Sequence, residues 1–190
     1  MTMPGSADRK LLLLRHAKSA WPDVPDHERP LAHRGRRNAP AMGRWLRVAG
    51  HLPDQVLCST ARRARETWRL MQPELAVTPP VAFDNGVYEA SAARLLELIR
   101  HAPPAARTLL VVGHDPGVPE LALTLTATTP AAAAGAASDA AQSAMFDRMR
   151  VKFPTAAVAI FEFTGNWNQL GPGSARLTCF VTSRELIARG

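Results

Sequence analysis

The sequence predicts a mixed α/β fold with three layers (α/β/α), in which helices cover both faces of a mostly parallel central sheet. Two observations predict it. Short apolar runs alternate with amphipathic segments along the 190 residues, the pattern of strands joined by crossover helices. The run at 11–14 is all Leu, and the run at 108–112 is Leu and Val after Thr108, as in strands buried on both faces. We expect one domain over 1–190, because no internal repeat or boundary is apparent.

The individual elements follow from local composition. A polar tail at 1–9 precedes the first strand, and a polar loop fills 18–37. Apolar residues spaced three or four apart predict a helix over 35–49, and Ser59-Thr60 suits the N-cap of the next helix. Further strands are expected at 55–58, 81–83, 156–163 and 175–181, the last two paired as a hairpin-like unit. Further helices are expected at 61–71, 92–101 and 117–125.

The segment at 126–150 differs from the rest of the chain. Its first part consists mostly of Ala, Thr and Ser, a composition typical of a low-complexity insert. We expect a mobile insert or a lid here, or a short Ala-rich helix within it.

Composition limits the function classes. Lys plus Arg is 23 and Asp plus Glu is 16, which gives a net charge of +7. This charge permits nucleic-acid binding, but no basic run is interleaved with aromatic residues, so we expect no nucleic-acid partner. Cys58 and Cys179 are far apart and are expected to be small buried residues. No metal-ligand spacing is present, and we expect neither a metal nor a cofactor.

The four leucines at 11–14 are the most apolar run near the N-terminus. They are too few for the core of a signal peptide or for a membrane span. We therefore expect a soluble, cytoplasmic protein with no membrane partner.

Three apolar runs end in residues suited to phosphate. The junctions are Leu14 with Arg15-His16, Cys58 with Ser59, and Val112 with Gly113-His114. The carboxyl ends of parallel strands share one rim of a sheet, where ligands bind. Arginine offers phosphate a planar fork of donors, and histidine can act as a nucleophile. The helix after Ser59 adds free N–H groups and Arg63 near its start. The sequence therefore predicts phosphoryl chemistry at this rim.

These residues resemble the motifs of the histidine phosphatase superfamily. Arg15-His16-Ala17 is similar to the family's Arg-His-Gly, with alanine in the third place. Ser59 to Thr67 matches its Ser-x-x-x-Arg-Ala-x-x-Thr, and Gly113-His114 matches its Gly-His after a buried strand. The resemblance implies a phosphoglycerate mutase-like fold. Alanine is the smallest change from glycine, so we expect Ala17 to be tolerated if its φ is negative.

The chain is most similar to the small SixA-type phosphohistidine phosphatases. Arg29-Pro30-Leu31 with Gly35 resembles their Arg-Pro-Leu…Gly segment, and Val112 to Gly117 resembles their Val-Gly-His-Asn-Pro-Gly. Residues 153–156 and 171–175 resemble their late hairpin. The matches keep their order from residue 11 to residue 181.

The resemblance implies a role for each motif residue. His16 would attack phosphorus with one ring nitrogen, while a backbone carbonyl holds the other and fixes the tautomer. The phosphoryl oxygens would be bound by Arg15, Arg29, Arg63 and His114. The proton donor stays open. Glu89 is favoured, Asp115 or no dedicated acid are alternatives, and Asp23 and Asp26 lie in the loop after the first strand. The remaining histidines are expected at the surface: His27, His33, His51 and His101.

The leading hypothesis is a metal-independent phosphatase that works through phosphohistidine on His16. Its expected substrate is a phosphohistidine protein, and its expected product is inorganic phosphate. One alternative is a small-metabolite phosphomonoesterase or a phosphoglycerate mutase-like enzyme. Another is a module that binds phospho-groups without turnover.

Overall fold

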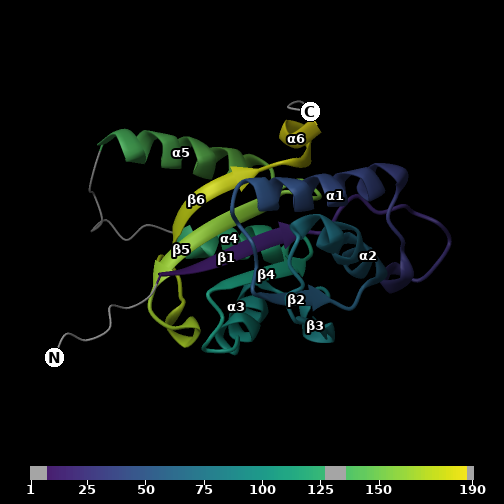
Figure 1. The fold of residues 1–190 in the computed structure, drawn as a ribbon, viewed down its shortest axis with the longest axis horizontal. Helices are drawn as coiled ribbons and strands as arrows, with labels where there is room; N and C mark the ends of the chain where they lie inside the picture. The colour runs from purple at the N-terminus through teal and green to yellow at the C-terminus, as the bar shows by residue number, and fades with distance from the viewer. Residues whose placement is uncertain (1–7, 127–135, 188–190) are drawn as a thin grey trace.

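A six-stranded sheet forms the centre of the molecule (Figure 1). The structure, a computed structural model, describes residues 8–126 and 136–187. The strands are β1 (Asp8–Arg15), β2 (Gln55–Ser59), β3 (Val81–Asp84), β4 (Thr108–Gly113), β5 (Val158–Thr164) and β6 (Arg176–Val181). Their order is β3-β2-β4-β1-β5-β6. The first four run parallel, β5 is antiparallel to β1, and β6 is antiparallel to β5. The predicted fold class and the hairpin-like final strands are confirmed.

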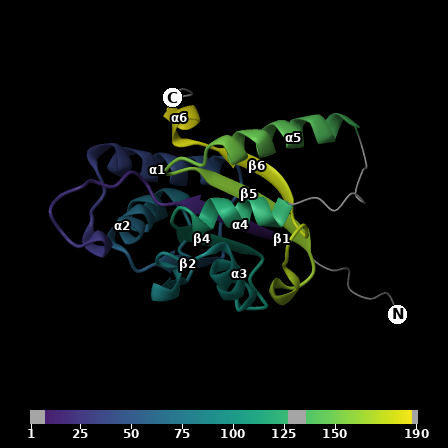
Figure 2. The same cartoon turned by 180° about the vertical axis from the view of Figure 1, so that it is seen from behind.

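Helices cover both faces of this sheet (Figures 1 and 2). The described α-helices are α1 (His33–Val48), α2 (Arg62–Met71), α3 (Ala92–Arg100), α4 (Gly117–Thr126), α5 (Ala136–Val151) and α6 (Ser183–Ile187). Side chains of α1, α2 and α6 pack in one core cluster, and those of α3, α4 and α5 pack in the other. Four 3-10 turns are described: η1 (Asp26–Glu28), η2 (Gln72–Leu75), η3 (Asn85–Val87) and η4 (Trp167–Gln169). Within the described ranges, no helix is both long and apolar enough to span a membrane.

Strand β1 is central in the sheet, and its four leucines at 11–14 are fully buried. Leu11 and Leu13 belong to the cluster under α3 and α4, whereas Leu12 and Leu14 belong to the cluster under α1 and α2. An uninterrupted apolar run is required because successive side chains of a strand point to opposite faces. The end of β1 therefore delivers Arg15 and His16 to the middle of the rim.

Several boundaries differ from the prediction. Strand β1 begins at Asp8, inside the expected tail, because Asp8 pairs with Thr164 of β5. Helix α1 begins at His33, two residues earlier than expected. The N-cap of α2 is Ala61 and lacks a side-chain cap. Instead, the Ser59 hydroxyl oxygen accepts the Ala61 N–H at 3.2 Å.

Much of the segment at 126–150 is helical. Helix α5 occupies 136–151, and Met149 near its end is buried in the core. We expect at most a short Ala-rich helix within this segment, and α5 is longer, with 16 residues. Residues 127–135 lie outside the described part of the chain, and a lid formed by this segment stays a prediction.

The loop after β1 is anchored to the start of α1. The Ala32 N–H donates to the Lys18 carbonyl at 2.8 Å, and the Ala20 N–H donates to the Pro30 carbonyl at 2.9 Å. Gly35 packs directly on this junction, since a Cβ at Gly35 would lie 2.2 Å from the Lys18 carbonyl oxygen. The motif glycine is therefore required by close backbone approach.

We expect Gly35→Ala to lower the free energy of unfolding by about 1–3 kcal/mol, because the added methyl must push the loop away from α1. Urea denaturation measures this change. Gly171→Ala is the matched control, because its Cβ would meet nothing closer than 3.5 Å. Equal stability of the two variants would show that the junction yields without cost.

Candidate active site

His16 lies at the carboxyl end of β1 and is 7% exposed. Its Nδ1 is 2.7 Å from the Ala17 carbonyl oxygen, and its Nε2 accepts the Arg63 Nε–H at 3.2 Å. A guanidinium only donates, so Nε2 carries no proton and Nδ1–H donates to the carbonyl. The backbone partner implied by the resemblance is present, and it leaves the Nε2 lone pair as the reactive one.

The surroundings of His16 keep its ring neutral. Burial, together with the nearby charges of Arg63 and Arg15, lowers its pKa to about 3, although the hydrogen bond to the Ala17 carbonyl opposes this shift. Burial disfavours the charged form because an apolar site solvates it poorly. A neutral imidazole can attack phosphorus, whereas a protonated one cannot.

This pKa predicts the pH dependence of activity. Above pH 3 the ring is unprotonated, so kcat/KM for an aryl phosphate, corrected for substrate ionisation, should show no loss near pH 6.5. Below pH 6.5 the unfolded chain binds a proton at this ring and the folded chain does not. The free energy of unfolding therefore decreases as pH falls from 6.5 toward 3. Imidazole NMR signals that disappear in His16→Gln would report the same titration directly. A midpoint near 6.5 would contradict the buried environment.

Arg63 connects His16 to the loop after β1. It lies in the first turn of α2 and is 6% exposed. Its Nη1 donates to the Asp26 carbonyl at 2.7 Å, and its Nη2 donates to Asp26 Oδ2 at 2.9 Å. One guanidinium therefore contacts both the ring that would attack and a carboxylate beside it.

Asp26 is held by three donors. Besides Arg63, its carboxylate accepts Arg29 Nη1 at 2.8 Å and the Tyr88 hydroxyl at 2.8 Å. Burial opposes ionisation, but the hydrogen bonds from Arg29, Tyr88 and Arg63 hold the pKa of Asp26 well below its usual range. An anion thus occupies donors that the resemblance assigns to a phosphoryl group.

Arg29 is buried at the base of the loop. Its Nη2 donates to the Ser19 hydroxyl at 2.7 Å and its Nε to the Ala20 carbonyl at 3.0 Å. The exposed ring of Trp21 covers it, with 3.2 Å between the guanidinium carbon and the ring centroid. These contacts fix the plane of the fork, and Asp26 takes the remaining terminal nitrogen.

Arg15 precedes His16 in the chain and contacts segments other than those that Arg63 contacts. Nη1 donates to the Phe153 carbonyl at 2.8 Å, and Nη2 lies 3.6 Å from Asp115 Oδ2. Its Nε is buried without a partner among the described residues. An unpaired buried donor is costly, so this nitrogen is suited to an incoming oxygen.

His114 follows β4 and faces His16, with 5.0 Å between the ring centroids. Its Nε2 lies 2.7 Å from the Ser59 hydroxyl oxygen, which already accepts the Ala61 N–H. The hydroxyl proton can therefore go to Nε2, which leaves Nδ1–H as a donor. Nδ1 is buried and has no partner within the described ranges. Burial, with nearby His16 and Arg63, lowers the pKa of His114 to about 3.

Ala17 is fully buried, and its carbonyl oxygen is the partner of His16 Nδ1. Its N–H donates to the Thr67 hydroxyl at 3.0 Å. The described non-glycine residues with positive φ are Ala76, Glu89 and Ala156, so Ala17 has the negative φ under which we expect tolerance. The replacement of the family glycine adds no backbone strain.

The favoured acid Glu89 and the alternative Asp115 both have exposed side chains. Glu89 is exposed, has a φ of 52° and makes no hydrogen bond or ion pair within the described part. Asp115 is half exposed and is near Arg15. Neither forms a hydrogen bond with His16 among the described residues, whereas Asp26, named only as a loop carboxylate, contacts Arg63, which donates to His16.

The chain is similar to known proteins in both sequence and fold. The model of the histidine phosphatase superfamily (branch 1) matches residues 11–98. An uncharacterized protein of Mycobacterium tuberculosis is 38% identical over 172 residues, which are 90% of this chain and 100% of the relative. The structure of a candidate phosphohistidine phosphatase SixA from Nakamurella multipartitia is 31% identical, with a TM-score of 0.77, and the match covers 94% of this chain and 98% of that chain. The chain belongs to the histidine phosphatase superfamily.

A second solved structure extends the likeness of fold. The protein histidine phosphatase SixA complexed with tungstate is 19% identical, with a TM-score of 0.67, over 93% of this chain and 99% of that one. The expected membership in a phosphatase superfamily and the SixA-like fold are both confirmed.

Two residues near this site, Tyr88 and His27, are not indicated by the sequence motifs. Tyr88 donates to Asp26, and its ring meets His114 edge-on at 5.6 Å between centroids. Burial, together with Asp26, raises the pKa of Tyr88 to about 12. His27, expected at the surface without a role, is half-buried, with its Nε2 3.0 Å from the Thr60 hydroxyl oxygen. A sequence signal existed for one of them, because Tyr88 is the only tyrosine in the chain.

We expect Asp26→Asn to strengthen inhibition by inorganic phosphate about fivefold, because the amide competes less well than a carboxylate for the guanidinium groups. The inhibition constant of phosphate against aryl phosphate measures this. Asp23→Asn changes an exposed carboxyl in the same loop and serves as the control. Weaker inhibition in Asp26→Asn would show that the carboxylate mainly positions the arginines.

Proposed function

We propose that the chain is a metal-independent phosphatase that forms phosphohistidine on His16 and acts on phosphohistidine in a protein. The observation that carries this proposal is the neutral, buried His16. Its Nδ1 is bound to a backbone carbonyl and its Nε2 lies at Arg63. This arrangement leaves the Nε2 lone pair unprotonated and places it beside a positively charged guanidinium group.

The chemistry needs two half-reactions. In the first, the Nε2 lone pair of His16 forms a bond to phosphorus while the bond to the substrate's imidazole breaks. The leaving imidazole takes that electron pair and already holds a proton on its other nitrogen, so it departs neutral. In the second, the oxygen of water bonds to phosphorus while the bond between phosphorus and His16 Nε2 breaks. Nε2 takes back that electron pair, which restores neutral His16, and both protons of the water leave on inorganic phosphate. No dedicated acid is required for this substrate.

The surrounding donors stabilise the transferring group. Phosphoryl transfer depends mainly on positioning and electrostatics, because charge is spread over the three equatorial oxygens. Arg63 and Arg29 each present several N–H donors on a planar guanidinium group, and these donors bind Asp26 when substrate is absent. Arg15 Nε and His114 Nδ1 are two further buried nitrogens beside His16, and neither has a partner among the described residues.

A substrate panel tests the proposal: a phosphohistidine peptide, sugar phosphates and an aryl phosphate at equal concentration. We expect kcat/KM to be highest for the phosphohistidine peptide and unchanged by a chelator. A higher value for a sugar phosphate would favour a small-metabolite phosphomonoesterase or a mutase-like enzyme. Tight phosphate binding without turnover of any substrate would favour a phospho-group binding module. A sharp loss of activity with chelator would contradict the metal-independent mechanism.

A further inference from the structure

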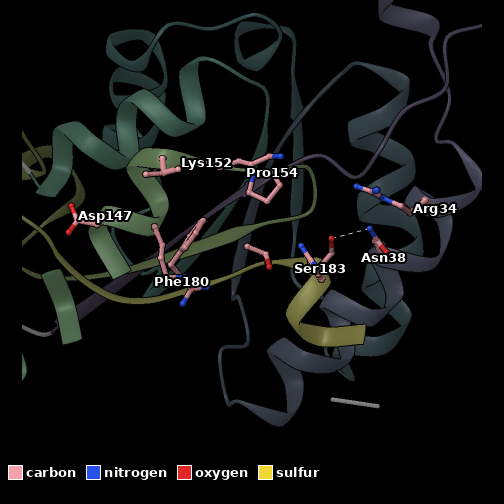
Figure 3. A pocket seen from close by; sticks show the side chains of 11 residues that line it. Arg34, Asn38, Asp147, Lys152, Pro154, Phe180 and Ser183 are labelled. Atoms are coloured by element: carbon pink, nitrogen blue, oxygen red, sulfur yellow. Dashed lines mark hydrogen bonds between the residues drawn. The ribbon is translucent and has the colours of Figure 1, made fainter. Parts of the chain in front are cut away.

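An open cavity of about 1030 Å³ lies beyond the end of the edge strand β6 (Figure 3). Helix α1 contributes one wall, the last turn of α5 and Pro154 contribute another, and the start of α6 closes the end. Asn38 Nδ2 donates to the Ser183 hydroxyl at 3.1 Å, which ties α1 to α6. None of the residues proposed for phosphoryl transfer lines this cavity.

The cavity opens at the same rim as His16. Val181, the last residue of β6, pairs with Val158, which pairs with Leu14 of β1. Adjacent strands lie about 4.8 Å apart, so β6 ends about 10 Å from β1. Both walls continue into the site. Arg34 lies two residues after Ala32, which binds the Lys18 carbonyl, and Pro154 follows Phe153, which binds Arg15.

The lining is basic, with apolar residues between the charges. Arg34, Lys152 and Arg184 line it from three different segments, and none of them forms an ion pair within the described part of the chain. Arg148 is paired with Glu185, and the lining acid Asp147 lies 3.9 Å from Arg150. Three unpaired cations thus face one cavity.

We propose that this cavity binds an acidic segment of the substrate protein, about three to six residues from the phosphorylated side chain. The inference rests on the proposed function, because it requires a phosphorylated protein. An extended chain covers about 3.3 Å per residue, so three or more residues span the distance from β1 to the end of β6. Exposed Val151 and partly exposed Pro154 suit peptide side chains between the acidic ones.

A peptide fits this lining better than a nucleic acid. Single-stranded nucleic acids are bound largely by stacking of bases on exposed aromatic rings. The aromatic residue of the lining is Phe180, which is 3% exposed and packs against Phe153. The lining therefore has positive charges but no exposed aromatic ring on which a base could stack.

Two phosphohistidine peptides test the inference, one with three Glu at positions three to six from the phosphohistidine and one with Gln there. We expect kcat/KM to be roughly tenfold higher for the acidic peptide at low salt. This preference should shrink as ionic strength rises from about 0.05 to about 0.5 M. The triple variant Arg34→Glu, Lys152→Glu, Arg184→Glu should lose the preference and keep wild-type kcat/KM on aryl phosphate.

The matched control is Arg107→Glu, an exposed charge just before the amino end of β4 and therefore at the other end of the parallel strands from His16, which should keep the preference. Equal kcat/KM for both peptides, or a preference that survives the triple variant, would overturn the inference alone. Turnover of aryl phosphate but of neither peptide would contradict the proposed function and this inference with it. A single-stranded oligonucleotide that inhibits wild type but not the triple variant, with no preference between peptides, would assign the cavity to nucleic acid.

Discussion

His16→Ala is expected to lower kcat on aryl phosphate by roughly 10⁴- to 10⁶-fold, because it removes the nitrogen that accepts the phosphoryl group. Incubation of the wild-type protein with a phosphodonor should give an acid-labile, alkali-stable label, and this label should be absent from the variant. We expect His16→Ala to keep the native fold, because the buried ring is at the rim of the sheet rather than in the apolar core.

His101→Ala is the control for this experiment. His101 is exposed at the end of α3 and contacts the Glu97 carbonyl, so the variant should keep both label and turnover. A label that persists in His16→Ala would assign the nucleophile to another residue. An unchanged thermal transition would show that any loss in His16→Ala comes from chemistry.

Arg63→Met should lower kcat/KM by about 10²- to 10³-fold, because a preorganised cationic donor at a transferring phosphoryl group is worth several kcal/mol. Arg63→Lys should recover only part of this loss, since an ammonium cannot contact His16 and the Asp26 loop in the same plane. The pKa of His16 should rise in Arg63→Met, because one nearby positive charge is gone. Steady-state kinetics and imidazole NMR measure the two effects.

Arg69→Met is the control that separates the specific role of Arg63 from the effect of removing any positive charge from α2. Arg69 is exposed on the same helix, and it forms no ion pair within the described residues. We expect wild-type kcat/KM for this control. A loss in Arg69→Met as large as in Arg63→Met would attribute the effect to the net charge of the helix.

Sequence periodicity predicted the elements that bury apolar residues. The run Leu11–Leu14 predicted a strand covered on both faces, and the structure has all four leucines buried between two helical layers. Boundaries were predicted less well. Asp8 to Lys10 look like a polar tail, but they extend β1 because β5 offers a paired backbone at Thr164, Phe163 and Glu162.

The loop between β1 and α1 was beyond sequence reasoning. Asp26 and Tyr88 are 62 positions apart, and Asp26 and Arg63 are 37 apart. Their contact depends on how a polar loop folds over α2, and polar loops have no periodicity from which contacts follow. The motifs therefore named Arg29 and Arg63 but not the carboxylate that bridges them. Glu89, favoured as the acid from the family resemblance, is exposed, and its role stays a prediction.

The sequence by itself determined which strands exist and which reactive residues follow them, because strand burial and chain connectivity are local properties of the apolar runs. It thereby predicted that Arg15, His16 and His114 share one rim. Only the tertiary structure decided the state of His16. Its tautomer is set by the Ala17 carbonyl and Arg63, and its low pKa is set by burial among segments distant in the chain. Solvation and charge depend on what surrounds a group in space, and that environment is complete only after folding.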